Sequence, residues 1–595
     1  MEEVIKRCVG WLKIFLKNHG AACILAILVG ATSIAPHLLA QNALGTDYQG
    51  FPLLFQSNED YYLARVQEII DGHWLVSSSY IFEYKNNLTL VFPIGEFLYA
   101  FPALLLGVSA VHVLMATKFI FPALLFLLIY VLLYNLSKQT RGDKINAIFG
   151  GLLITIGTYF ANYKETWSIL TGQSSDLFLS IWTRPVNPIT GALFLFIFLI
   201  LLWKSIGSDK WYWPVAAGIV LGLMPGYIFS WMVALAVLSA YVVLLLVRKR
   251  LEIIKKLFFV VLSSALVGMP IWYLWFSSLF VAEDSQYVAS RFGLMLTHYP
   301  ILNKVVLVQT VFFLALFLFE WQRKKKNSEK FEEWWWFAAA LVLGNWLVYN
   351  QQIITGRVVW VPHLTQYTTP TAFLTFVLVL GNYFKTRTPK LWSAVIAAAC
   401  CVIALFSLMT TLSYRSQLKE FSELQRLVPF FEWLNSYTAK DCVVLTKEQE
   451  GTEILSGWIP AFTHCNTYSS TYALVPPERV YFNYIVSLRL QGIKKQDLEQ
   501  YLWEHKAELR AYFFETWPQL FVPTGASVDD SWLAGPIQTL IDNYDFLLKE
   551  DFTTALKRYR VDYLASEESM SASLAEQFPR ACLMGKFGSV YVYQL

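Results

Sequence analysis

Residues 57–74 read SNEDYYLARVQEIIDGHW and place acids, tyrosines and an arginine just after the first long apolar run of the chain. Carboxylates in such a place suit general-base chemistry, because partial burial raises the pKa of an acid toward neutral pH. Asp60 and Glu59 are therefore the candidate catalytic residues, and either could be the base. Asp47 is a third acid in the same predicted loop. The alternative is that the paired acids only favour the positive end of a helix dipole.

The same segment has the pattern of a short amphipathic helix. Ser57 or Asn58 is a typical N-cap, and Gly72 is a typical stop. One face would hold Tyr62, Val66, Ile69, Ile70 and His73, and the opposite face would hold Asp60, Ala64, Gln67 and Asp71. This pattern predicts that the acids point into a cavity at the membrane surface.

Polar residues also gather in two later predicted loops. The loop 162–188 contributes Asp176, Arg184 and Asn187, and the loop 350–368 contributes Gln351, Gln352, Arg357, His363 and Tyr367. Arginine binds phosphate oxygens through parallel N–H groups, so Arg357 and Arg184 are the candidate phosphate ligands. Tyr62 and Arg65 of the first loop would complete the substrate pocket. For Arg184, anchoring of the chain at the membrane surface is an equal alternative.

Composition indicates what must position these residues. The chain has 595 residues, of which 56% are hydrophobic and 15% charged, with a mean hydropathy of +0.45. About 20 apolar residues cross a bilayer core, and about eleven such runs occur. They lie near 21–43, 118–136, 146–161, 189–203, 212–225, 227–247, 257–281, 301–320, 334–349, 369–384 and 391–413. The sequence therefore predicts a polytopic α-helical membrane protein. A net charge of only +4 gives no sign of nucleic-acid binding.

Basic residues predict the orientation of the spans. They precede the first run and gather in the loops 138–144, 248–256, 323–330 and 385–390. The positive-inside rule puts these loops and the N-terminus in the cytoplasm. The assignment requires that the interrupted apolar stretch 93–116 does not cross, so we expect it to be re-entrant or interfacial. Every candidate site residue then lies outside the cytoplasm.

The last part of the chain has a different composition. Residues 414–595 combine strand-like runs at 441–446 and near the C-terminus with helical stretches around 493–513 and 536–559. We therefore expect a transmembrane catalytic domain at 1–413, with its first outer loop at 44–96, and an extracytoplasmic α/β domain at 414–595. In an oxidising compartment Cys442 and Cys465 could form a disulfide. The alternative is that both are buried thiols.

The opening motif resembles sequences of the GT-C glycosyltransferase superfamily. Glu59, Tyr62, Glu68, Gly72 and Trp74 match the DE-x-x-Y…RE…G-x-W pattern of aminoarabinose and protein mannosyltransferases, with Asn58 at the leading Asp. Asp60, Tyr62 and Arg65 match in part the D-x-Y-Y-x-x-R start of oligosaccharyltransferase catalytic subunits, whose WWDYG motif is absent. The resemblance implies a GT-C-like fold and inverting sugar transfer from a polyprenyl-phosphate donor.

The predicted location supports this type of donor. Nucleotide-sugars are absent outside the cytoplasm, and the chain has no P-loop or Rossmann glycine pattern. We expect a glycosyltransferase of the inner, cytoplasmic membrane that contacts membrane lipid and acts on a glycan, lipid or protein acceptor. The resemblance requires no cofactor. A divalent cation, Mg²⁺ or Mn²⁺, is an option, since Asp47, Glu59, Asp60 and Asp176 offer oxygen ligands.

Three other functions remain open from the sequence. An oligosaccharyltransferase-like enzyme would share the topology and part of the opening motif. A lipid or solute transporter should bury charges near the middle of the membrane, whereas these apolar runs are nearly free of charge. A membrane scaffold would explain the outer domain but leaves the polar loop 350–368 without a role.

The predicted topology can be tested by labelling. A cysteine placed in 323–330 should resist an impermeant thiol reagent in intact cells, because this basic loop is predicted to be cytoplasmic. A cysteine placed in 520–530 should react. Labelling in the reverse sense would move every candidate site residue to the cytoplasmic side.

Overall fold

The computed structural model describes most of the chain. The described ranges are 2–54, 58–87, 91–137, 140–161, 180–277, 295–296, 298–448, 454–470, 475–513 and 533–595, together with residues 164, 167 and 171. Asp176 and the segment 520–530 lie outside these residues.

Each of the predicted apolar runs is a helix. These helices are α1 (Glu2–Leu44), α4 (Ala110–Leu136), α5 (Arg141–Thr155), α7 (Ile189–Gly207), α8 (Tyr212–Leu223), α9 (Ile228–Val247), α10 (Leu251–Phe276), α12 (Lys304–Lys326), α13 (Glu333–Asn350), α15 (Val361–Arg387) and α16 (Pro389–Leu412). Among the described residues, seven helices are long and apolar enough to cross a membrane. The polytopic architecture is confirmed, but the count of eleven spans is not, because α5, α8, α13 and α15 do not meet this measure.

The interrupted stretch 93–116 forms two elements. Its first part is α3 (Ile94–Leu106), and its second part opens α4. With 13 residues, α3 is about 20 Å long, which is less than the roughly 30 Å of a hydrocarbon core. The acid that interrupts the run, Glu96, is buried and accepts from Arg65 Nε at 2.5 Å. The ion pair with Arg65 of the first outer loop explains why an acid is buried in this short helix.

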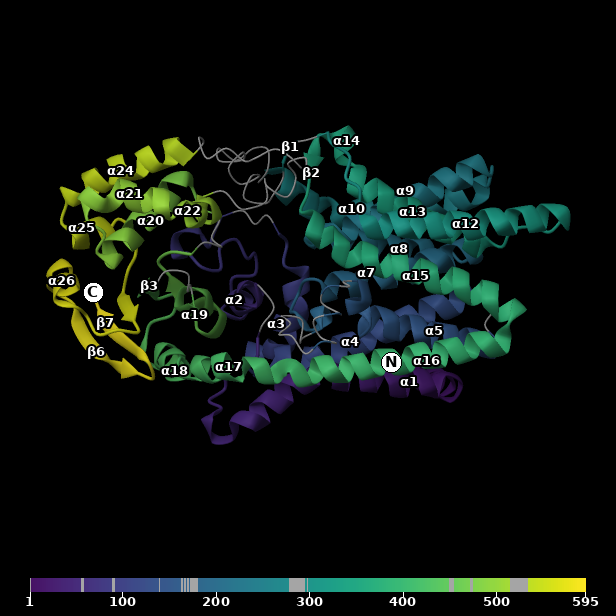
Figure 1. The fold of residues 1–595 in the computed structure, drawn as a ribbon, viewed down its shortest axis with the longest axis horizontal. Helices are drawn as coiled ribbons and strands as arrows, with labels where there is room; N and C mark the ends of the chain where they lie inside the picture. Colours follow the sequence, from purple (N-terminus) through teal and green to yellow (C-terminus); the bar gives the residue numbers. More distant parts are fainter. Residues whose placement is uncertain are drawn as a thin grey trace.

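The basic turns meet at one end of the helix bundle. Three ion pairs join their elements: Arg248–Glu333 at 2.6 Å, Lys385–Asp143 at 2.6 Å and Arg387–Glu320 at 3.0 Å. In Figure 1 the α12 end and the turn between α15 and α16 lie away from the C-terminal domain. This arrangement is the one that the positive-inside prediction requires. The side of the membrane on which it lies stays a prediction.

The C-terminal domain is built on a five-stranded mixed sheet in the order β4-β3-β5-β7-β6. Its strands are β3 (Val443–Lys447), β4 (Asn466–Thr467), β5 (Tyr563–Ser566), β6 (Cys582–Phe587) and β7 (Val590–Gln594). Strand β3 runs parallel to β4 and β5, and β7 runs antiparallel to β5 and β6. The predicted α/β character is confirmed.

The remaining helices of this part follow α16. They are α17 (Leu418–Gln425), α18 (Val428–Tyr437), α19 (Ile454–Phe462), α20 (Pro477–Gln491), α21 (Lys495–Glu504), α22 (Lys506–Phe513), α24 (Ala534–Leu548), α25 (Phe552–Leu556) and α26 (Ala572–Gln577). Of the two alternatives for Cys442 and Cys465, the structure has the disulfide, since the two residues are bonded. It links the residue before β3 to the residue before β4.

The first outer loop and the C-terminal domain share one hydrophobic core. Buried residues from Phe51 to Leu114 pack in the same cluster as residues from Leu427 to Tyr593. A separate cluster holds most of the membrane helices together. The Thr467 backbone N–H also donates to the Tyr80 carbonyl at 2.9 Å, which joins the outer loop to the edge strand β4. The first loop and residues 414–595 therefore form one folded unit, which we call the outer body.

Candidate active site

Helix α2 (Glu59–Ile70) carries the opening motif between the bundle and the C-terminal domain. Figure 1 labels α2 beside α19, on the side of the bundle that faces the sheet. Asn58 is the N-cap and has a positive φ of 67°, and Gly72 follows the helix with a φ of 102°. The predicted start and stop are confirmed. Ala64, expected on the same face as Asp60, is buried, and α19 packs against α2.

The two candidate acids have different surroundings. Glu59 is 1% exposed, and its Oε2 lies 3.4 Å from Lys118 Nζ in α4. Asp60 is half-buried and faces α19, with Oδ2 2.7 Å from the position that a Cβ at Gly457 would occupy. A side chain at Gly457 would require this carboxylate to move. Glu59 is therefore part of a buried ion pair, and Asp60 is the acid at the boundary between the two bodies.

A group of polar side chains meets at Asn187, which is fully buried. Its Nδ2 donates to Tyr62 Oη at 3.0 Å and lies 3.0 Å from His363 Nδ1. Tyr367 Oη donates to Asn187 Oδ1 at 3.2 Å. Tyr62, Asn187, His363 and Tyr367 are all predicted site residues, and they come from three predicted outer segments. We call these four residues the Asn187 cluster.

Arg184 lies beside this cluster and is 5% exposed. Its guanidinium carbon is 5.2 Å from the centre of the Tyr62 ring, which is a cation–π contact. Its Nε has no hydrogen-bond partner, and no described carboxylate forms an ion pair with it. A buried guanidinium with N–H groups left over is suited to a phosphate or carboxylate ligand.

Sequence reasoning missed an aromatic wall around His363. Tyr227 Oη lies 3.2 Å from His363 Nδ1, and the rings of Phe229 and Trp360 stack on the imidazole with centroids 4.7 and 5.2 Å away. Tyr227 lies at the short turn between two apolar runs, next to Pro225 and Gly226, and Phe229 is in the first turn of α9. Tyr227 was the sequence feature that could have indicated these aromatic residues.

Lys118 was missed as well. It lies in α4, near the start of an apolar run, and its side chain is fully buried. A lone lysine inside an apolar helix is a signal of function in membrane proteins. Because the predicted apolar run 118–136 begins at this residue, the sequence pattern places Lys118 at the edge of the run and not as a charge within a helix.

Two predicted residues of the first loop lie elsewhere. Arg65 bonds to Glu96 and donates from Nη2 to the Val91 carbonyl at 2.8 Å, so it ties α2 to α3. Asp47 is exposed in the short helix η1 (Gly45–Asp47) at the end of α1. Neither side chain joins the Asn187 cluster.

The predicted residues that follow α13 are arranged differently. Gln352 is fully buried and donates from Nε2 to the Tyr299 carbonyl at 2.9 Å, in α14 (Gln352–Thr355). Gln351 Oε1 accepts from Thr355 Oγ1 at 2.7 Å. Gln352 therefore bonds to the chain segment before α12, and Gln351 bonds within its own helical turn. Arg357 is in the short strand β2 (Arg357–Val358), paired with β1 (Met295–Leu296), and its side chain lies outside the described part.

Three of the four predicted oxygen ligands lie among the described residues, and Asp176 lies outside them. Asp47 is exposed at the end of α1, and Glu59 is engaged by Lys118. Within the described ranges, no group of three or more His, Cys, Asp or Glu side chains is placed to hold a metal ion.

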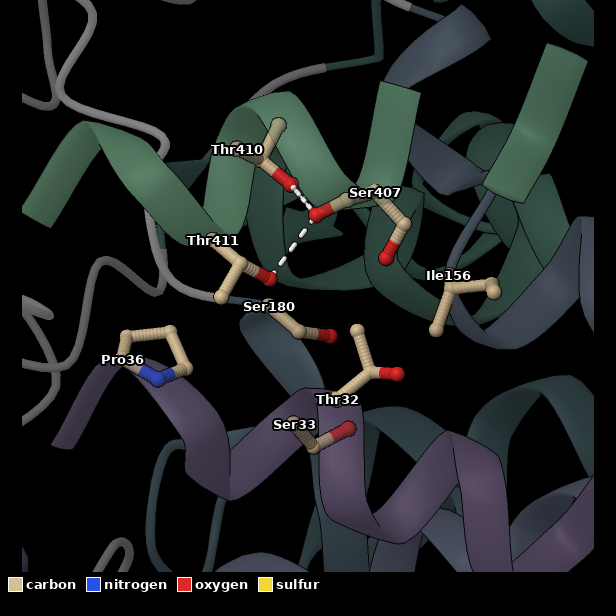
Figure 2. Close-up of a pocket in the computed structure, with 8 residues that line it drawn as sticks. All are labelled: Thr32, Ser33, Pro36, Ile156, Ser180, Ser407, Thr410 and Thr411. Carbon is tan, nitrogen blue, oxygen red and sulfur yellow. Dashed lines mark hydrogen bonds between the residues drawn. The ribbon is translucent and has the colours of Figure 1, made fainter. Parts of the chain in front are cut away.

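A small hydroxyl-lined cavity lies between α1, α16 and the start of the short helix η4 (Ile181–Thr183) (Figure 2). Its lining residues are Thr32, Ser33, Pro36, Ile156, Ser180, Ser407, Thr410 and Thr411. Four of the hydroxyls donate to carbonyls of their own helices. At about 20 Å³ the cavity holds about one water molecule. It is too small for a sugar ring.

A cluster of charges joins the end of α2 to the C-terminal domain. Lys85 Nζ lies 3.2 Å from Glu68 Oε2 and 2.5 Å from Asp441 Oδ1, and His73 Nε2 lies 3.5 Å from the same Asp441 oxygen. Burial raises the pKa of Glu68 to about 7, even though Lys85 acts to lower it. Asp441 directly precedes the disulfide-bonded Cys442, so the cluster connects the outer loop to a covalently braced part of the sheet.

Comparisons with known proteins found solved structures that align over most of the chain. No protein-family model matches the chain, and no curated protein matches its sequence. A solved structure of ArnT from Cupriavidus metallidurans bound to undecaprenyl phosphate aligns over 98% of both chains, with 12% identity and a TM-score of 0.47. The apo form of the same protein covers 99% of this chain and 98% of its own, with 12% identity and a TM-score of 0.46.

The raised pKa of Glu68 predicts how stability depends on pH. The folded protein holds this proton more tightly than the unfolded chain, whose glutamate has an ordinary value of 4.5. The free energy of unfolding therefore falls as pH rises from about 5 to about 7. Glu68→Gln removes this loss, and Lys85 keeps Asp441 as its partner. The free energy of unfolding of the variant, minus that of wild type, should therefore increase by at least about 1 kcal/mol from pH 5 to pH 8.

Denaturant melts of the detergent-solubilised protein at several pH values would measure this difference. The exposed Glu499→Gln in α21 is the matched control and should follow the wild-type slope. Parallel pH profiles for wild type and Glu68→Gln would contradict the prediction.

Proposed function

We propose that this protein is a membrane glycosyltransferase that moves a sugar from a polyprenyl-phosphate donor to an acceptor on the non-cytoplasmic side of the membrane. The observation that carries the proposal is Arg184, a buried guanidinium without a carboxylate partner among the described residues. It lies at the outer-loop end of an apolar helix bundle, beside the helix that bears Asp60. An anionic group attached to a long apolar tail fits this combination of charge and surroundings.

Arg184 would hold the donor phosphate. Its cation–π contact with Tyr62 and the hydrogen bonds of the Asn187 cluster keep the surrounding side chains in place. Nearby, the charge of Lys118 is balanced by Glu59, so the Arg184 charge remains available to an anion. Arg357 stays a candidate second ligand of the phosphate on the basis of its sequence position.

Asp60 would act as the general base. Its carboxylate takes the proton from an acceptor hydroxyl, and the acceptor oxygen then attacks the anomeric carbon from the face opposite the phosphate. The bond from the sugar to the phosphate oxygen breaks, and the polyprenyl phosphate leaves with the electron pair. This displacement inverts the anomeric centre. Because Asp60 lies against α19, the acceptor would approach it near the contact of α2 with the C-terminal domain.

Substitution of Arg184 tests donor binding. Arg184→Gln keeps a polar side chain but loses the charge, and a hydrogen bond to a charged group contributes about 1.5–3 kcal/mol. We expect the KM for a polyprenyl-phosphate sugar to rise by about 10- to 100-fold while the acceptor KM stays near wild type. Arg415→Gln is the matched control, because Arg415 is an exposed arginine after α16. An unchanged donor KM in Arg184→Gln would remove the main support for the proposal.

Substitution of Asp60 tests the chemical step. Asp60→Asn keeps the size of the side chain and removes the proton acceptor, and loss of a general base lowers rates by about 10²–10⁴. The fall should appear in kcat, measured with purified protein, a polyprenyl-phosphate sugar and membrane extract as the acceptor source. Asp497→Asn, at an exposed acid in α21, should keep wild-type kcat. Wild-type turnover by Asp60→Asn would exclude this residue as the base.

A further inference from the structure

Lys118 makes two contacts that link separate outer loops. Its Nζ lies 3.4 Å from Glu59 Oε2 and donates to the Thr183 carbonyl oxygen at 3.0 Å. The side chains of Lys118 and Glu59 are 0% and 1% exposed. An ammonium in such a place is costly in a membrane protein, and lysines of this kind commonly belong to functional sites.

Each partner of Lys118 immediately precedes a residue of the proposed active site. Glu59 begins α2 and is followed by Asp60. Thr183 ends η4 and is followed by Arg184. One amine therefore contacts the chain next to the proposed base and next to the proposed phosphate ligand.

We propose that Lys118 is a positioning residue that fixes the spacing between Asp60 and Arg184. The inference rests on the function proposed above. Neither segment can shift relative to the other without breaking a buried contact of the ammonium, because α4 carries Lys118 between them. The spacing matters for the reaction, since the acceptor oxygen and the leaving phosphate must lie on opposite sides of the anomeric carbon.

The alternative is that Lys118 only neutralises the buried Glu59 carboxylate. Removing the lysine alone does not separate the two roles, because a buried carboxylate left without its cation destabilises the fold in either case. The double variant Lys118→Met/Glu59→Gln removes both charges and keeps similar volumes. Replacing both members of a buried ion pair in this way is often neutral for stability. Glu59→Gln alone retains the bond from Lys118 to Thr183 and serves as the reference.

The experiment compares melting temperatures and steady-state kinetics of wild type, Glu59→Gln and the double variant, with a polyprenyl-phosphate sugar as donor. We expect the donor KM of the double variant to exceed that of Glu59→Gln by at least about tenfold, and its kcat to be lower by a similar factor. The acceptor KM should not change. The double variant Lys118→Gln/Glu59→Gln, which can still donate to Thr183, should restore part of the donor KM.

The KM values make the result independent of folding yield, because partial unfolding lowers the active fraction without changing the KM of the molecules that remain folded. A double variant with the donor KM of Glu59→Gln, whatever its melting temperature, would show that Lys118 is only a counter-ion. If the wild type transfers sugar in the same assay, such a result excludes the positioning role of Lys118 and leaves the proposed function standing. Absence of transfer by the wild type would instead overturn the proposed function, and this inference with it.

Discussion

The exclusion of charge from the hydrocarbon interior of a bilayer determines where this protein can carry out chemistry. Helix α15 illustrates the constraint, because it is 27 residues and about 40 Å long and has its histidine and its basic residues near its ends. His363, near its start, belongs to the Asn187 cluster, and Lys385, near its end, pairs with Asp143. Lys118 is the costly exception, and it is held by a carboxylate and a carbonyl. The candidate active site therefore lies at one end of the bundle.

The C-terminal domain completes this end of the molecule. It contacts α2 through α19, where Gly457 admits the Asp60 carboxylate, and through the charges of Lys85 and Asp441. The disulfide braces the part of the sheet that provides Asp441. Asp60 consequently has the bundle on one side and the C-terminal domain on the other. In this arrangement the domain would form one wall of the proposed site.

The sequence predicted the elements better than the contacts between them. Hydropathy located the membrane helices, and cap residues located α2, because both signals are local. Tyr62, Arg184, Asn187, His363 and Tyr367 were identified as polar residues in apolar surroundings, and they do converge. Arg65 was not distinguished from them, since its partner Glu96 is distant in sequence. The role of Gly457 depends on tertiary packing, which periodicity does not encode.

The shared core of the outer body has a consequence for biosynthesis. Residues 51–114 emerge early from the ribosome, but the apolar surface that covers them belongs to residues 427–593. At about 5–20 residues per second, the first loop waits on the order of a minute for its packing partner. During that time its apolar side chains lack the partners that cover them in the folded protein. Chaperones or the membrane surface itself would have to shield them. A chain that ends after α16 would lack these packing partners permanently.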